Sequence, residues 1–224
     1  NMTLLIKNEI GYRNLTKLIS DAYLSKHTNA VPVIDFSWLK TRNTGLIALS
    51  GGREGQIGRL LSLNKDEEAR EILKINQDLF DDRFYLEIQR TGRTGEESFI
   101  QKALNLSDKF DCPLVATNDV RFISQKEFEA HEARVCIHDS RLLNDPRRER
   151  QYSEEQYLRS ASEMIDLFKD IPEAIDNTLE IAKRCNLQIS LGDNYLPDYP
   201  IPDGLSADDF LTKQARKGLE QKYH

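Results

Sequence analysis

The sequence contains no run of 18 uncharged apolar residues, and its first residues lack a basic start followed by a long apolar stretch. The first absence excludes a membrane-spanning helix and the second excludes a signal peptide. We therefore expect a chain that is neither embedded in a membrane nor secreted, with a cytoplasmic location.

Cysteine is also scarce, and there is no excess of positive charge. The three cysteines, Cys112, Cys136 and Cys185, are widely spaced and form no C-x-x-C pair, which argues against a disulfide framework and a Cys-rich zinc site. The 31 Lys and Arg residues are outnumbered by 37 Asp and Glu residues, which gives a net charge of −6. Proteins that grip nucleic acid by themselves neutralise phosphates with clustered Lys and Arg, so this segment is not expected to do so alone.

The apolar residues that are present alternate between strand and helix patterns. Short apolar runs at 2–7, 46–49, 84–88 and 114–117 predict strands, and helical spacing is found at 12–26, from Gln56 onward and at 65–80. Two capping-box patterns, Thr94 with Glu97 and Ser124 with Glu127, predict the start of two further helices. Strands separated by helices indicate parallel pairing, hence a doubly wound sheet or a barrel.

The pattern changes after Asp139, where we expect helices without intervening strands. One helix is predicted to begin at Ser153 with Gln156, and another to run from Ile171 to Cys185. Residues 196–204 gather three prolines and a glycine and predict a semi-rigid linker. An amphipathic helix is expected from Ala207 to about residue 222.

Three loops at predicted strand ends are the places to look for chemistry, because reactive groups of parallel α/β folds lie at the carboxyl ends of strands. They are Ser50 to Arg53, the region of Glu87, and Asn118 to Arg121. The glycine cluster after Ser50 matches neither nucleotide-binding glycine motif and predicts a tight turn from strand to helix.

Two further motifs favour structural interpretations. His131 and Glu132 are a near miss to a zinc-protease helix, but Val135 stands where the second histidine is needed, so a surface or half-buried histidine is expected. The Arg147, Arg148 and Arg150 run predicts a solvated loop, with phosphate contact as the alternative.

An ordered series of motifs then carries a resemblance that covers nearly the whole chain. The segments are MTLLIKNEIGYRNLTKLIS, PVIDFSWL, LIALSGGREGQIGRLL, FYLEIQRTGR, VATNDVRFI, FEAHEARVCIHD, QYSEEQYLRS and KDIPEAIDNTLEIAKRCN. They resemble the amino-terminal PHP (polymerase and histidinol phosphatase) domain of the bacterial DNA polymerase III alpha subunit family, most closely its gammaproteobacterial form.

The resemblance implies a fold and a domain organisation. It implies a partial, distorted (β/α)7 barrel whose first strands and His-x-His motif precede Asn1, with a helical carboxyl-terminal annex. Residues 1–186 would be the carboxyl-terminal two thirds of the PHP domain, 187–206 an exit linker, and 207–224 the start of the connection to the palm domain. The polymerase carboxylates and their magnesium ions would lie beyond His224, so this segment alone is not expected to be catalytic.

Active PHP domains bind three metal ions through His, Asp, Glu and Cys, and this sequence departs from that pattern. Asn1 stands where active members have a histidine, and Gly52 stands where they have a cysteine. Asp119 survives, but Arg121 replaces a histidine, and an arginine cannot coordinate a metal because it is always protonated. The resemblance therefore predicts four vestigial positions and no bound metal.

Two functions remain in competition at this stage. One is a scaffold and docking domain of the replicative polymerase with a decayed metal site, and the other is a working metal-dependent phosphoesterase or proofreading 3′–5′ exonuclease. The first is favoured because Gly52 and Arg121 remove ligands. The family further implies docking of the separate proofreading exonuclease subunit, contact with the palm domain of the same chain, and contact with DNA only through the intact polymerase.

Asp119 and Arg121 lead to a structural expectation of their own. Side chains at i and i+2 point the same way on an extended backbone, and these residues continue directly from a strand, so an ion pair is predicted. Replacing Arg121 with alanine is expected to lower the free energy of unfolding by about 1–4 kcal/mol, depending on how deeply the pair is buried.

Overall fold

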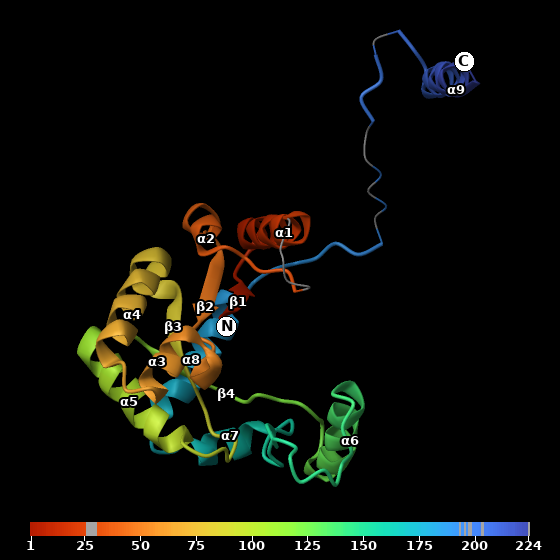
Figure 1. Ribbon diagram of the computed structural model, residues 1–224. Coiled ribbons are helices and arrows are strands. Elements are labelled where there is room, and N and C mark those ends of the chain that lie inside the picture. The colour runs from red at the N-terminus through yellow and green to blue at the C-terminus, as the bar shows by residue number, and fades with distance from the viewer. Residues whose placement is uncertain (26–30, 193, 195, 197–198, 203, 224) are drawn as a thin grey trace. The chain divides into compact units, whose positions relative to one another are not determined.

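The computed structural model describes residues 1–25, 31–192, 194, 196, 199–202 and 204–223. Its strands are β1 (Thr3–Ile6), β2 (Leu46–Leu49), β3 (Phe84–Gln89) and β4 (Leu114–Thr117). Its helices are α1 (Glu9–Leu24), α2 (Phe36–Arg42), α3 (Gln56–Ser62), α4 (Asp66–Phe80), α5 (Glu96–Phe110), α6 (Phe128–His138), α7 (Ala161–Leu167), α8 (Pro172–Arg184) and α9 (Ala207–Tyr223) (Figure 1). Short 3-10 turns are η1 (Gly52–Glu54), η2 (Asp81–Arg83) and η3 (Gln125–Glu127).

The chain divides into two compact units. The larger unit, Asn1–Gln188, contains the sheet, and the second, Ile189–His224, contains α9. The predicted final helix is confirmed by α9. Parts of the predicted linker (193, 195, 197–198 and 203) and the last residue of the helix predicted at 12–26 lie outside the described residues. None of the described helices has the length and apolar character needed to cross a membrane.

The four strands form one mixed sheet in the order β1-β2-β3-β4. β2, β3 and β4 pair in parallel, as predicted. The prediction of parallel pairing is wrong for β1, which runs antiparallel to β2 with Thr3 opposite Leu49. The fold is therefore a mixed α/β arrangement, and the partial (β/α)7 barrel stays a prediction.

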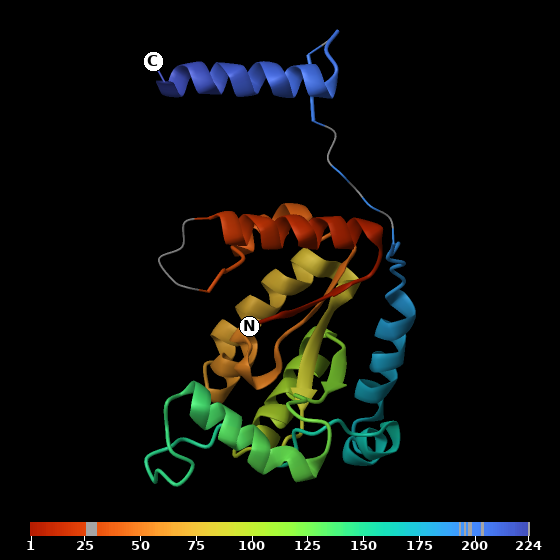
Figure 2. The same cartoon turned by 90° about the vertical axis from the view of Figure 1, so that its right-hand side faces the viewer.

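The direction of β1 follows from where the first two helices lie. The Lys7 N–H donates to the Gly45 carbonyl at 2.8 Å, so the end of β1 and the start of β2 are held together. The Asn8 side chain accepts from the Gly11 N–H at 3.1 Å and caps α1 beside this junction. Figure 2 shows α1 across this end of the strands, whereas a crossover helix would pack along the sheet and return the chain to its other end.

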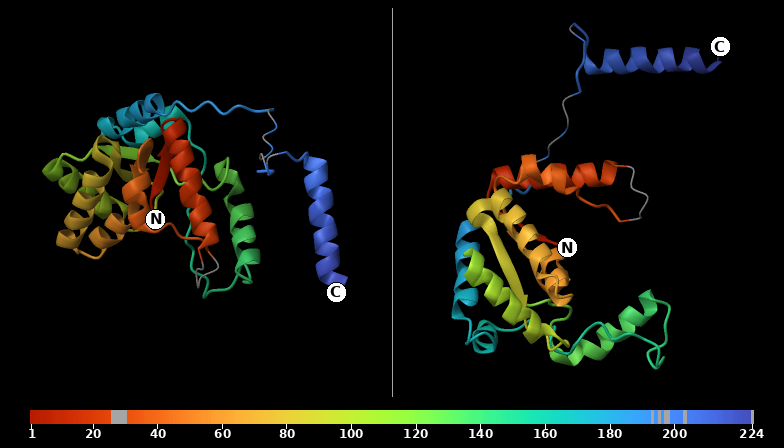
Figure 3. Two further views of the ribbon diagram at one scale, coloured as in Figure 1. Left: turned by 90° about the horizontal axis from the view of Figure 1, so that it is seen from above. Right: turned by 60° about the vertical axis from the view of Figure 1, so that its left-hand side comes forward.

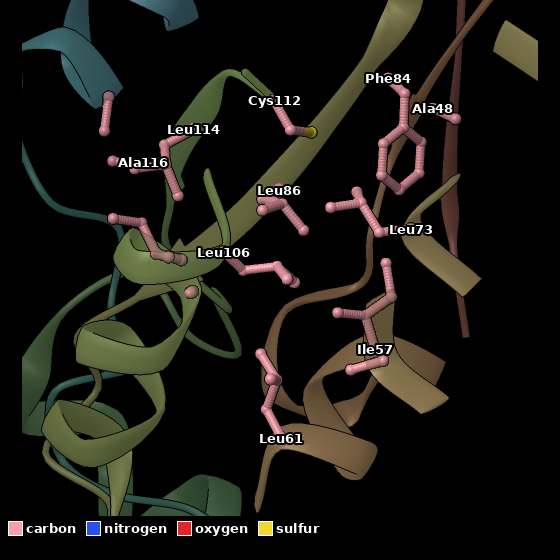
Figure 4. Close-up of a cluster of buried hydrophobic side chains, with 14 of the residues drawn as sticks. Ala48, Ile57, Leu61, Leu73, Phe84, Leu86, Leu106, Cys112, Leu114 and Ala116 are labelled. Carbon is pink, nitrogen blue, oxygen red and sulfur yellow. The ribbon is translucent and has the colours of Figure 1, made fainter. Parts of the chain in front are cut away.

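The main core lies between one face of the sheet and the helices α3, α4 and α5. Alternate strand residues such as Ala48, Leu86 and Leu114 pack against Ile57 and Leu73 from the helices (Figure 4). The opposite face carries a smaller cluster that Ile181 of α8 joins. Figure 2 shows α8 and α4 on different sides of the strands. The buried apolar strands predicted from the sequence are thus confirmed by packing on both faces.

Two predicted helix starts are wrong. The helix α5 begins at Glu96 behind Gly95, because the Glu96 carboxylate turns back to accept from the Thr91 N–H at 2.8 Å instead of leaving Thr94 to cap the helix. The helix predicted at Ser153 is absent there, and α7 begins only at Ala161. Its capping box is formed by Ser160 and Glu163.

The remaining predicted elements are present. The capping box of Ser124 and Glu127 is confirmed just before α6, and α8 begins with Pro172 at its first position. The segment that contains α6 projects away from the sheet (Figure 3). Its two ends meet at a parallel bridge between Phe122 and Tyr157, where the Leu158 N–H donates to the Phe122 carbonyl at 3.0 Å. We call residues 119–156 the α6 lobe.

Candidate functional site

The carboxyl ends of β2, β3 and β4 lie at one edge of the sheet because these strands are parallel. The start of β1 lies at the same edge because β1 is antiparallel to β2. A Cβ added to Gly51, just after β2, would lie 2.5 Å from the Asn1 carbonyl oxygen. The fold therefore brings the loops singled out in the sequence to a common edge.

The turn after β2 needs its glycines. Gly51 and Gly52 have φ angles of 83° and 56°, in the left-handed region that side chains disfavour. A Cβ at Gly55 would lie 1.8 Å from the Ser50 carbonyl oxygen, so the chain can close here only without a side chain. The predicted tight turn from strand to helix is confirmed.

Glu87 is the centre of a buried polar cluster at this edge. Its side chain is 6% exposed, and its two carboxylate oxygens accept hydrogen bonds from the Gly51 N–H at 3.1 Å, the Thr117 hydroxyl and the Gln89 amide at 3.2 Å. The Glu87 N–H donates to the Ser50 hydroxyl at 2.9 Å. These bonds join the ends of β2, β3 and β4, so Glu87 holds the edge of the sheet together.

Asp119 and Arg121 form the predicted ion pair. The Arg121 guanidinium lies 2.9 Å from one Asp119 carboxylate oxygen and 3.1 Å from the other. Gln156 is fully buried, and its side-chain amide donates to the Asp119 carboxylate at 2.8 Å. The backbone carbonyl of Gln156 accepts from the backbone N–H of Arg121, also at 2.8 Å. The pair therefore ties the two ends of the α6 lobe together.

Contacts of Arg121 with Tyr152, and of Tyr152 with His131, extend this network into the α6 lobe. The Arg121 guanidinium lies 5.2 Å from the centre of the Tyr152 ring, and the His131 ring meets Tyr152 edge-on at 4.7 Å. His131 is 7% exposed, so the expectation of a surface or half-buried histidine is wrong. Burial, followed by the positive charge of Arg134, lowers the pKa of His131 and so favours its neutral ring.

The loop that contains Arg147, Arg148 and Arg150 is solvated only in part, unlike its prediction. Arg147 is solvated, but the Arg148 side chain is only 9% exposed and is paired with Glu132, which is 5% exposed. The loop thus packs on α6 instead of lying free. Arg150 is exposed.

The exposure of Arg121 sets the expected effect of its removal. Because the Arg121 side chain is 41% exposed and Asp119 24%, water screens the pair. Arg121→Ala is expected to lower the free energy of unfolding by at most about 1 kcal/mol, the low end of the range expected from sequence. Thermal melting monitored by circular dichroism checks this, and a loss several times larger would contradict it.

The predicted metal-site positions line different parts of this end of the sheet. Asn1 lines a pocket with Ser50, whereas Asp119 and Arg121 line another with Arg53. Gly52 lies beside the Gln89 amide. Among the residues that the structure describes, no three His, Cys, Asp or Glu side chains cluster closely enough to hold a metal ion.

Sequence reasoning missed three members of the site: Gln89, Thr117 and Gln156. Gln89 stands two residues after Glu87 on the same strand, so alternation was a signal that could have found it. Gln156 is fully buried, whereas the sequence predicts it in the first turn of a helix. Nothing local in the sequence connects it to Asp119.

Comparison with known proteins gives two findings. Residues 1–91 match the family model of the PHP domain. The chain is 50% identical over 221 residues to DNA polymerase III subunit alpha of Pseudomonas fluorescens and of Vibrio cholerae, and 49% identical over 222 residues to that of Escherichia coli K12. Each match covers 99% of this chain but 19% of the relative, so the chain spans about a fifth of the length of these curated relatives.

Proposed function

Because this chain is homologous over 99% of its length to part of bacterial DNA polymerase III subunit alpha, we propose that it is the PHP-domain region of a replicative DNA polymerase. The single observation that supports this is identity near 50% over 221 residues, an aligned length that includes both the sheet and the helices after it. The complete protein is then a DNA-directed DNA polymerase that uses magnesium and acts in the cytoplasm. This region has a structural role in it.

The domain boundaries are part of this proposal. Residues 1–186 form the carboxyl-terminal two thirds of the PHP domain, 187–206 form the linker, and 207–224 begin the connection to the palm domain. The division of the described chain near residue 188 supports the first boundary. DNA contacts this region only as part of the intact polymerase, and the exonuclease subunit docks on it.

The polymerase proposal is tested with the complete protein that contains this chain. It should incorporate nucleotides on a primed template in the presence of magnesium, and the 224-residue chain alone, as the matched control, should incorporate none. A complete protein without templated synthesis would overturn the proposal. Co-purification of the chain with the exonuclease subunit of the same organism tests the docking role separately.

We further propose that the metal site is decayed. Gly52 offers no ligand, and Arg121 presents a cation. The Asp119 carboxylate already accepts a hydrogen bond from the Gln156 side-chain amide at 2.8 Å. These observations support a structural Asp119 over a catalytic one, so we do not propose phosphoesterase activity.

Metal analysis gives a direct prediction. After dialysis, the chain is expected to retain no stoichiometric zinc or manganese, because the residues near Asp119 supply too few ligands. Arg121→His alone is expected to gain neither metal nor metal-dependent phosphodiesterase activity, since Gly52 still contributes nothing. Stoichiometric metal by elemental analysis in the unsubstituted chain would contradict this.

A further inference from the structure

A cavity of about 670 Å³ lies beside the Asp119–Arg121 pair. Its walls come from the loops after β2, β3 and β4 and from the end of the α6 lobe. Four arginines line it, Arg53, Arg93, Arg121 and Arg150, together with two carboxylates, Glu54 and Asp119. We call it the arginine cavity.

Two of the four arginines are already neutralised. Arg121 is paired with Asp119 at 2.9 Å, and Arg93 lies 3.4 Å from the buried Glu96 carboxylate. Glu54 has its own partner outside the cavity, Arg59, at 3.8 Å. The wall carboxylates therefore do not offset the other two arginines.

Arg53 and Arg150 are the unmatched cations. Among the residues with described placement, the Arg53 guanidinium donates only to the Thr94 carbonyl, which carries no full charge. Within the described ranges, Arg150 makes no ion pair and no hydrogen bond, and it is exposed. A cavity with two unpaired guanidinium groups in its walls is complementary to an anion.

We propose that the arginine cavity binds an acidic peptide segment of a partner protein, with carboxylates placed against Arg53 and Arg150. A carboxylate suits these walls better than a phosphate does. Asp119, itself a carboxylate, already pairs through both of its oxygens with the cavity arginine Arg121. This inference does not depend on the replicative role proposed above.

Fluorescence polarisation of the 224-residue chain with fluorescein-labelled hexaglutamate tests the proposal, at low ionic strength where screening is weak. The chain is expected to bind hexaglutamate at least about tenfold more tightly than labelled hexaglutamine. Arg53→Gln and Arg150→Gln should each weaken binding roughly three- to tenfold, and the double variant should weaken it further. Arg150 has no described partner, so its substitution leaves the fold intact, which circular dichroism verifies.

Arg147→Gln is the matched control. It removes the same charge from the same loop, but Arg147 is bonded to Asp145 and does not line the cavity, so binding should be unchanged. Equal weakening by Arg147→Gln and Arg150→Gln would overturn the proposal, as would equal affinity for hexaglutamate and hexaglutamine. Binding of inorganic phosphate or pyrophosphate without binding of hexaglutamate would replace it with a phosphate site.

Discussion

Gly11→Ala is expected to destabilise the larger unit by about 2–4 kcal/mol. A Cβ at Gly11 would lie 1.9 Å from the Gly45 carbonyl oxygen, so either α1 or the start of β2 must move. Neither can move freely, because the Gly45 carbonyl accepts from Lys7 at 2.8 Å and the Gly11 N–H donates to Asn8 at 3.1 Å. Thermal unfolding followed by circular dichroism should show the midpoint lowered by roughly 5–15 °C.

Gly218→Ala is the matched substitution for this experiment. Gly218 lies in α9, where no atom of the described residues is within 4 Å of an added Cβ, so the change should only stabilise this helix, by up to about 1 kcal/mol. The midpoint of the larger unit should not fall. Equal melting of the Gly11→Ala and Gly218→Ala proteins would show that the close approach at Gly45 is wrong.

Glu87→Ala is expected to lower the free energy of unfolding by about 2–4 kcal/mol. The change removes the acceptor for the Gly51 N–H, the Thr117 hydroxyl and the Gln89 amide at an edge where Glu87 itself is 6% exposed. Buried donors left without acceptors cost more than the hydrogen bonds contributed. Urea denaturation at constant pH measures the loss.

Two other substitutions separate this cause from a general effect of losing a carboxylate. Glu71→Ala, on the exposed side of α4, should leave stability nearly unchanged. Glu87→Gln should cost about 1–2 kcal/mol, because one oxygen remains as an acceptor while the new amide faces the Gly51 N–H. A Glu87→Ala protein as stable as Glu71→Ala would mean that the cluster does not hold the strand ends.

Local sequence determined the elements more reliably than their arrangement. The apolar runs at 46–49 and 114–117 could be predicted as strands because their residues are buried on both faces of the sheet. The direction of β1 could not, because it depends on contact between Gly11 in α1 and Gly45 just before β2, which lie far apart in the sequence. Periodicity reports burial of a segment but carries no information about such contacts.

The candidate site also has one part that local sequence predicts and another that it does not. The Asp119–Arg121 pair was predictable from two-residue spacing on extended backbone, whereas the role of Gln156 was not. The predicted contact between Ser153 and Gln156 does form, with the Ser153 N–H donating to the Gln156 side chain at 2.9 Å. No helix follows it, because the same amide group is also held by Asp119 across the base of the lobe.

The closed base of the α6 lobe bears on how far the lobe can vary in length. Arg121, Phe122, Gln156 and Leu158 join the two ends of the excursion by backbone and side-chain bonds, so β4 and the chain leading to α7 are held regardless of what lies between. The entropic cost of closing a loop rises only slowly with its length. Changes of length in the exposed part of the lobe can therefore be accommodated beyond the base while the sheet keeps its geometry.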